Sequence, residues 1–150
     1  MELREVPERN TLSIRTTTLA ENLPQVIGKS LWQVLDYLST EGVQTAGPPF
    51  ALYHNMDMSN LDVEMGFPVN EKVPGNEEVK PSSIPAGQVA VDMHLGPYET
   101  MEVTYNKMLA ALQEQGLEMD TFMYEFYLND PDEVSPEEIQ TEIFMPIKQA

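Results

Sequence analysis

The hydrophobic pattern of the first half of the chain predicts one helix among three strands. Residues 12–18, which are rich in threonine and also contain isoleucine, predict a strand. Residues 50–54 and 61–69 predict two more. Residues 24–41 lie between the first and second of these strands and predict a helix, because their apolar side chains recur every three or four residues. Those side chains are Ile27, Leu31, Val34, Leu35 and Leu38.

The second half repeats this order. Residues 88–95 alternate in polarity and predict a half-buried strand with Val89, Val91 and Met93 pointing inward. A helix is expected to open at Gly96-Pro97 and to end before Gly116, with an apolar stripe at helical spacing. That stripe consists of Tyr98, Met101, Tyr105, Met108 and Leu112. Two further strands are expected at 122–128 and 138–147.

The spacing of glycine and tyrosine suggests that the two halves are copies of one module. Gly42 precedes Tyr53 by the same distance as Gly116 precedes Tyr127 (53 − 42 = 127 − 116 = 11). Further pairs keep this order at an offset of 78: Glu64/Glu142, Pro68/Pro146 and Val69/Ile147. Chance similarity between amphipathic segments is the alternative explanation.

These elements predict an α+β fold built from two pseudo-symmetric strand–helix–strand–strand modules, with about eight strands and two main helices. We expect a single domain over residues 1–150. Module one is expected at about 1–69 and module two at 86–150, joined by the polar, proline-containing connector 70–85. A ligand cleft is expected between the modules.

The charge of the chain restricts its partners. The 25 acidic and 8 basic residues give a formal net charge of −17, with no basic cluster. Nucleic-acid binding requires clustered lysine and arginine, so we expect no direct contact with nucleic acid. The negative field favours cationic ligands, and an acidic surface that mimics DNA is a further possibility.

The composition also bears on location and on chemistry. The chain has no cysteine, no basic-then-apolar leader and no apolar run long enough for a membrane span, so a cytoplasmic protein is expected. Phosphate-binding loops and serine nucleophile motifs are absent. The two histidines, His54 and His94, fall in different modules. We therefore expect neither a metal nor a cofactor.

Glu125 is the main candidate for a functional residue. It lies in a strand between Met123, Tyr124, Phe126 and Tyr127. An acid in so apolar a strand either faces water or is buried with a partner, and both alternatives are open. A buried carboxylate could be neutralised by a cationic ligand. The first module has alanine at the equivalent position, residue 51, so the acid distinguishes the two modules.

Aromatic and methionine side chains are candidates for the walls of the same ligand site. Tyr127 shares a strand face with Glu125, and Tyr53 is its equivalent in module one. Aromatic faces suit cations and flat rings, and methionine suits many shapes. The remaining candidates are Tyr98, Trp32, Phe67, Met65 and Met93. For Trp32, burial in the core is the main expectation and a pocket wall is the alternative.

Segments of both modules form an ordered set that spans essentially the whole chain. In module two they are His94-Leu95-Gly96-Pro97-Tyr98-Glu99, Glu125-Phe126-Tyr127-Leu128-Asn129-Asp130-Pro131 and Thr141-Glu142-Ile143 with Pro146-Ile147. In module one they are Gly47-Pro48-Pro49, Tyr53-His54 and Asp62-Val63-Glu64-Met65-Gly66-Phe67-Pro68-Val69. Together these segments resemble the GyrI-like small-molecule-binding domain, the family that includes effector-binding domains of AraC-type and multidrug-responsive regulators.

The resemblance implies two pseudo-symmetric modules with a ligand cleft where they meet, and a central acid corresponding to Glu125 that pairs with cationic aromatic compounds. Because the pattern begins almost at Met1, a stand-alone member is expected. The first expectation is a binding protein that senses or sequesters such compounds. A hydrolase that opens cyclopropane rings of reactive toxins, using Glu125 and a tyrosine, is the second. The third is an acidic interaction module that inhibits a nucleic-acid enzyme such as gyrase.

Overall fold

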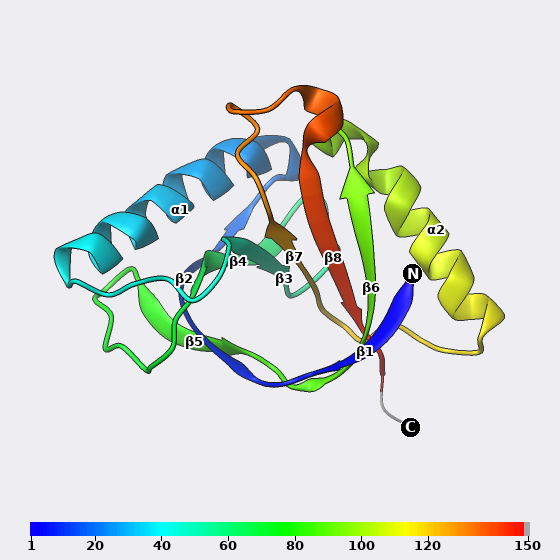
Figure 1. Cartoon of the computed structure of the whole chain (residues 1–150), viewed down its shortest axis with the longest axis horizontal. Helices are drawn as coiled ribbons and strands as arrows, with labels where there is room; N and C mark the ends of the chain where they lie inside the picture. The colour runs from blue at the N-terminus through cyan, green and yellow to red at the C-terminus, as the bar shows by residue number, and fades with distance from the viewer. Residues whose placement is uncertain (149–150) are drawn as a thin grey trace. The chain divides into compact units, whose positions relative to one another are not determined.

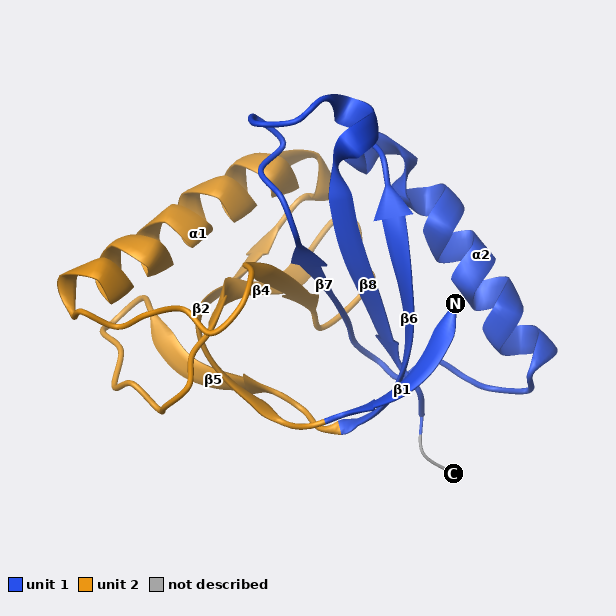
Figure 2. Ribbon diagram, viewed as in Figure 1, with its two compact units in different colours: residues 1–6, 87–150 blue, residues 7–86 orange. Residues whose placement is uncertain are grey.

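The computed structural model describes residues 1–148 and divides into two compact units (Figure 2). One unit contains residues 7–86, and the other contains residues 1–6 together with 87–150. Each unit places one long helix against antiparallel strands. The eight strands and two main helices confirm the predicted α+β fold.

The unit of residues 7–86 holds one helix against a sheet in the order β3-β4-β2-β5. Its elements are β2 (Arg9–Thr18), the short 3-10 helix η1 (Ala20–Asn22), α1 (Leu23–Thr40), β3 (Phe50–Tyr53), β4 (Leu61–Pro68) and β5 (Lys80–Ile84). Helix α1 lies along β2 and β4 (Figure 1). Its Val34 and Leu38 are almost fully buried in a cluster with Leu12 and Phe67. Each such side chain stabilises the fold by about 1.5–3 kcal/mol.

The other unit repeats this arrangement with the sheet order β1-β6-β8-β7. Its elements are β1 (Glu2–Val6), β6 (Gly87–Leu95), the 3-10 helix η2 (Tyr98–Thr100), α2 (Met101–Glu114), β7 (Met123–Tyr127), the 3-10 helix η3 (Pro136–Glu138) and β8 (Gln140–Pro146). Helix α2 runs beside β6 (Figure 1). Met101, Met108 and Leu112 form its buried stripe, as their spacing predicts.

Strand register and backbone hydrogen bonds confirm the duplication. Ala51 pairs with Met65 in one unit, and Glu125 pairs with Ile143 in the other. Ala51 and Glu125 are 74 residues apart, as are Tyr53 and Tyr127, and Met65 and Ile143 are 78 residues apart, as are Glu64 and Glu142. After each helix a backbone N–H donates to the same helix carbonyl position at 2.9 Å. These bonds are Val43 N to Leu38 O and Leu117 N to Leu112 O. Amphipathic segments that resemble each other by chance would not share both the strand register and these backbone hydrogen bonds.

The observed units differ from the predicted module bounds at two places. Residues 2–6 pair with β6, so the start of the chain belongs to the unit of residues 87–150. The predicted connector 70–85 contains β5, which pairs with β2. Both strands lie at an end of a strand order, where only one side is hydrogen-bonded. The sequence did not predict β1 and β5, because hydrophobic and polar residues alternate only weakly along them.

Two side chains expected inside lie outside. Trp32 on α1 is 68% exposed, because Val34 and Leu38 occupy the face that meets the sheet. Met93 is 40% exposed, although Val89 and Val91 on the same strand face are buried. Within the described residues, neither helix is long and apolar enough to cross a membrane.

The glycines that end the two helices generate a test of the fold. Gly42 and Gly116 both have φ of +69°, where a side chain is strained, and neither has an atom that a Cβ would meet. We expect Gly42→Ala and Gly116→Ala each to lower the free energy of unfolding by about 1 kcal/mol. Urea denaturation measures this free energy.

Gly28 provides the control for these substitutions. It lies inside α1 and also has open space around the Cβ position, but its φ is not in the left-handed region. Gly28→Ala should therefore raise the free energy of unfolding by about 0.5–1 kcal/mol. A loss of similar size at all three positions would contradict the role given to the two helix-ending glycines.

Candidate functional site

A buried carboxylate with two tyrosine donors lies in the unit of residues 87–150. Glu125 in β7 is 5% exposed. The Tyr105 hydroxyl donates to Glu125 Oε2 at 2.6 Å, and the Tyr127 hydroxyl donates to Glu125 Oε1 at 2.9 Å. Of the two alternatives that the sequence left open, the structure therefore selects burial with a partner.

The local sequence explains how these three side chains meet. Strand alternation places Glu125 and Tyr127 on the same face of β7. Tyr105 follows Met101 by four residues and precedes Met108 by three, so it belongs to the stripe of α2 that packs toward the sheet. A hydrogen bond to a charged group contributes about 1.5–3 kcal/mol, so these donors offset much of the cost of burying the carboxylate.

Tyr98 forms the partly open side of this group. Its ring lies 5.9 Å from the Tyr127 ring, centroid to centroid, at an interplanar angle of 73°. Tyr98 is 41% exposed. Burial raises the pKa of the Tyr98 hydroxyl, and the negative charges of Glu125 and Asp130 raise it further. The carboxylate is thus electrostatically connected to an aromatic ring that solvent reaches.

His94 holds the segment that carries Tyr98. This histidine is 5% exposed, and its Nε2 lies 3.1 Å from the Pro97 carbonyl oxygen. Its Nδ1 lies 2.7 Å from the Thr104 hydroxyl. Because a carbonyl only accepts, Nε2 donates to Pro97, and in the neutral ring Nδ1 then accepts from the Thr104 hydroxyl. His94 therefore ties the residues before Tyr98 to helix α2.

A second buried carboxylate lies in the unit of residues 7–86. Glu64 in β4 is 5% exposed, with its Oε2 accepting from the Ser13 hydroxyl at 2.7 Å. The Nε2 atom of His54 lies 2.9 Å from Glu64 Oε1. From the sequence, Glu64 was a repeat position and part of the family-like segment 62–69, and no binding role was predicted for it. The sequence feature that indicates its burial is the one seen at Glu125, an acid between apolar neighbours in a strand.

Of the predicted site residues, Glu125, Tyr127 and Tyr98 form one group. Met93 is not part of that group. It pairs across the sheet with Glu142, which pairs in turn with Phe126, so Met93 lies on the sheet face opposite Glu125.

The other four candidates belong to the unit of residues 7–86. Met65 and Phe67 are 0% and 9% exposed, and Phe67 is part of the core cluster beneath α1. Tyr53 is buried at 8% exposure, whereas Trp32 lies on the outer surface of α1.

Tyr105 is a member of the site that sequence reasoning missed, since it was assigned to the helix stripe alone. A comparison of the two modules contained the signal. Module one has Leu31 where module two has Tyr105, and Ala51 where module two has Glu125. The two polar replacements occur together, and they are the two partners of one hydrogen bond.

Within residues 1–148, no three His, Asp or Glu side chains are grouped so as to hold a metal ion. The chemistry available at the Glu125 group is that of a carboxylate, phenol hydroxyls and aromatic rings.

Comparison with known families and structures agrees with this architecture. The family model described as GyrI-like small molecule binding domain matches residues 1–148. Among curated proteins, none matches significantly. The crystal structure of the EcmrR C-terminal domain superposes with a TM-score of 0.86 at 22% identity, covering 99% of this chain and 97% of that one. In the EcmrR–DNA complex, the matched region is 57% of the longer EcmrR chain.

Two further solved structures share the fold. A hydrolase from Listeria innocua has a TM-score of 0.72 at 18% identity, covering 98% of this chain and 91% of that one. The protein SAV2435, solved bound to tetraphenylphosphonium, has a TM-score of 0.66 at 13% identity, with coverages of 98% and 93%. At these identities the likeness shows the fold alone.

The electrostatic connection between Glu125 and Tyr98 can be measured. We expect Glu125→Gln to lower the pKa of Tyr98, because it removes one of the negative charges that disfavour the phenolate. The pKa should stay above its ordinary value, because burial is the larger cause and remains. Titration of the Tyr98 ring signals by NMR measures this. Glu64→Gln, at the other buried acid, is the control and should leave Tyr98 unchanged; equal effects of the two variants would contradict the assignment.

Proposed function

The chain belongs to the family of GyrI-like small-molecule-binding domains, and we propose that it binds amphipathic, cationic aromatic compounds through Glu125. The observation that carries this proposal is the buried carboxylate held by the hydroxyls of Tyr105 and Tyr127. A fixed negative charge beside aromatic rings is complementary to a delocalised organic cation.

The surroundings of Glu125 support a ligand that combines charge with apolar rings. Tyr98 and Tyr127 meet edge to face, and Tyr98 is accessible to solvent. A flat cationic compound can stack on these rings while its charge approaches the carboxylate. The formal charge of −17 adds a long-range attraction for cations.

The fold comparison supports the same ligand class. SAV2435 was solved with tetraphenylphosphonium, a bulky aromatic cation. EcmrR was solved in complex with DNA, and this chain corresponds to its C-terminal domain. We therefore propose that this chain senses or sequesters such compounds, and that any effect on nucleic acid is indirect.

A hydrolase is the second candidate, because a carboxylate within hydrogen-bond distance of two phenol hydroxyls is an arrangement suited to acid–base chemistry. In such a reaction Glu125 would activate water and a tyrosine would donate a proton to the opened ring. Mass spectrometry of a reactive cyclopropane compound incubated with the protein separates the two functions. Retention of the intact compound supports binding, and multiple turnovers support hydrolysis.

Glu125→Gln tests the binding proposal, because it retains the shape of the side chain and removes its charge. We expect affinity for methyltriphenylphosphonium, measured by calorimetry, to fall by about tenfold to a hundredfold. Affinity for the neutral triphenylphosphine oxide, which has similar size, should change little.

Glu64→Gln is the matched control, since it alters the other buried carboxylate and should leave both affinities unchanged. Equal losses for the cationic and neutral compounds in Glu125→Gln would mean that Glu125 has a structural role only. Unchanged affinity for both would place the ligand elsewhere.

A further inference from the structure

The ladder between β2 and β5 stops before β2 does. Strand β5 pairs with residues Arg9 to Ser13 of β2, whereas β2 continues to Thr18. Strand β5 ends the strand order of its sheet. On this side, the last five residues of β2 therefore form an edge that no strand of the described chain covers.

The register identifies the backbone groups that face this edge. Asn10 O accepts from Val69 N at 2.9 Å, so the even-numbered residues of β2 bond toward β4. The odd-numbered residues bond the opposite way. Accordingly, the N–H and C=O groups of Arg15 and Thr17 point toward the open edge, and both residues are exposed.

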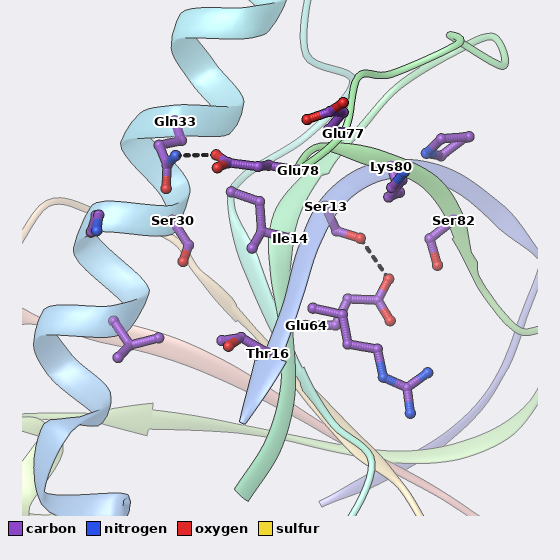
Figure 3. A pocket seen from close by; sticks show the side chains of 14 residues that line it. Ser13, Ile14, Thr16, Ser30, Gln33, Glu64, Glu77, Glu78, Lys80 and Ser82 are labelled. Carbon is purple, nitrogen blue, oxygen red and sulfur yellow. Dashed lines mark hydrogen bonds between the residues drawn. The ribbon is translucent and has the colours of Figure 1, made fainter. Parts of the chain in front are cut away.

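A cavity of about 620 Å³ lies against this edge (Figure 3). Helix α1 lines its other wall with Val26, Lys29, Ser30 and Gln33, which recur at helical spacing on one face. The Gln33 side chain donates to Glu78 Oε2 at 2.7 Å and so joins α1 to the segment that precedes β5. The volume is within the range of about 300–1,000 Å³ typical of ligand sites.

We propose that this groove binds an extended peptide, which adds to β2 as a further strand. A helix wall facing an uncovered strand edge is the geometry used in recognition by strand addition. The peptide backbone would bond to the N–H and C=O groups of Arg15 and Thr17. Its alternate side chains would face Ile14 and Val26, which line the cavity.

Charge determines which peptides fit. The cavity lining itself is balanced, with three basic and three acidic side chains: Arg15, Lys29, Lys80, Glu64, Glu77 and Glu78. The whole chain carries a formal charge of −17. This field attracts a basic peptide and opposes pairing of the edge with a second copy of the chain.

The proposed peptide groove is independent of the proposed function. It lies wholly in the unit of residues 7–86, whereas the Glu125 group lies in the other unit. Substitution of Glu125 should therefore leave peptide binding unchanged, so each proposal can fail without the other.

Three peptides test the proposal by calorimetry. The first is a capped peptide of sequence Lys-Thr-Val-Thr-Val-Thr-Lys. The second is the same peptide N-methylated at its five central residues, which cannot donate backbone hydrogen bonds. The third carries glutamate in place of both lysines. We expect the first to bind, the second to bind at least about tenfold more weakly and the third to bind more weakly than the first at low salt.

A pair of protein variants tests the same edge. Thr17→Pro removes the outward N–H without removing a bond to β4, and proline is tolerated on edge strands. Thr17→Val retains the N–H and is the control. We expect the first peptide to bind Thr17→Val like the native chain and to bind Thr17→Pro more weakly. In the native chain it should also slow hydrogen exchange at the amides of Arg15 and Thr17.

Several outcomes would overturn the proposal. They are the absence of saturable binding by the first peptide, equal affinity for the N-methylated peptide and unchanged exchange at Arg15 and Thr17. A dimer that Thr17→Pro abolishes, seen by sedimentation, would instead assign the edge to a second copy. If Thr17→Pro does not fold, the N-methylated peptide and the exchange data still decide.

Discussion

The hydrogen bonds from Tyr105 and Tyr127 to Glu125 are the interaction on which the candidate site depends. A carboxylate at 5% exposure is costly to bury, and the two phenol hydroxyls, one on each carboxylate oxygen, offset part of that cost. They also fix its position, since one donor comes from helix α2 and the other from the same strand. A charge fixed before a ligand arrives needs little rearrangement on binding.

The two units show how one backbone plan accommodates buried acids in different ways. In β7, Glu125 is on the sheet face that meets helix α2, because its donor Tyr105 belongs to that helix. In β4, Glu64 alternates with Met65 and lies on the face away from α1, where Ser13 and His54 are its partners. The strand register is the same in the two units, whereas the sheet face on which the buried acid lies differs between them.

The sequence was sufficient for the elements with strong periodicity. Both helices and the central strands were predicted within a few residues, because apolar spacing and the glycines at 42 and 116 mark them. Strands β1 and β5 were missed, since edge strands bury little and carry a weak pattern. Trp32 was expected to be buried, but it is exposed, whereas Val34 and Leu38 of the same helix are buried. Helical spacing alone does not show which of two adjacent faces of the helix packs on the sheet.

The candidate site was predictable in part. Glu125 could be identified by its apolar neighbours, and Tyr127 by strand alternation. Tyr105 could not be assigned to the carboxylate without knowing how α2 packs on β7. Comparing the two modules gives the best indication of this pairing in the sequence. Where module one has Leu31 and Ala51, module two has a hydrogen-bond donor, Tyr105, and an acceptor, Glu125.

A double-mutant cycle on Tyr105 and Glu125 tests the central claim most directly. The affinity for methyltriphenylphosphonium is measured in the native chain, Tyr105→Phe, Glu125→Gln and the double variant. If Tyr105 acts by holding the charge of Glu125, Tyr105→Phe weakens binding in the native chain and has little effect in Glu125→Gln, with a coupling of about 1 kcal/mol or more. Equal losses in both backgrounds would contradict the account, because Tyr105 would then act independently of the carboxylate.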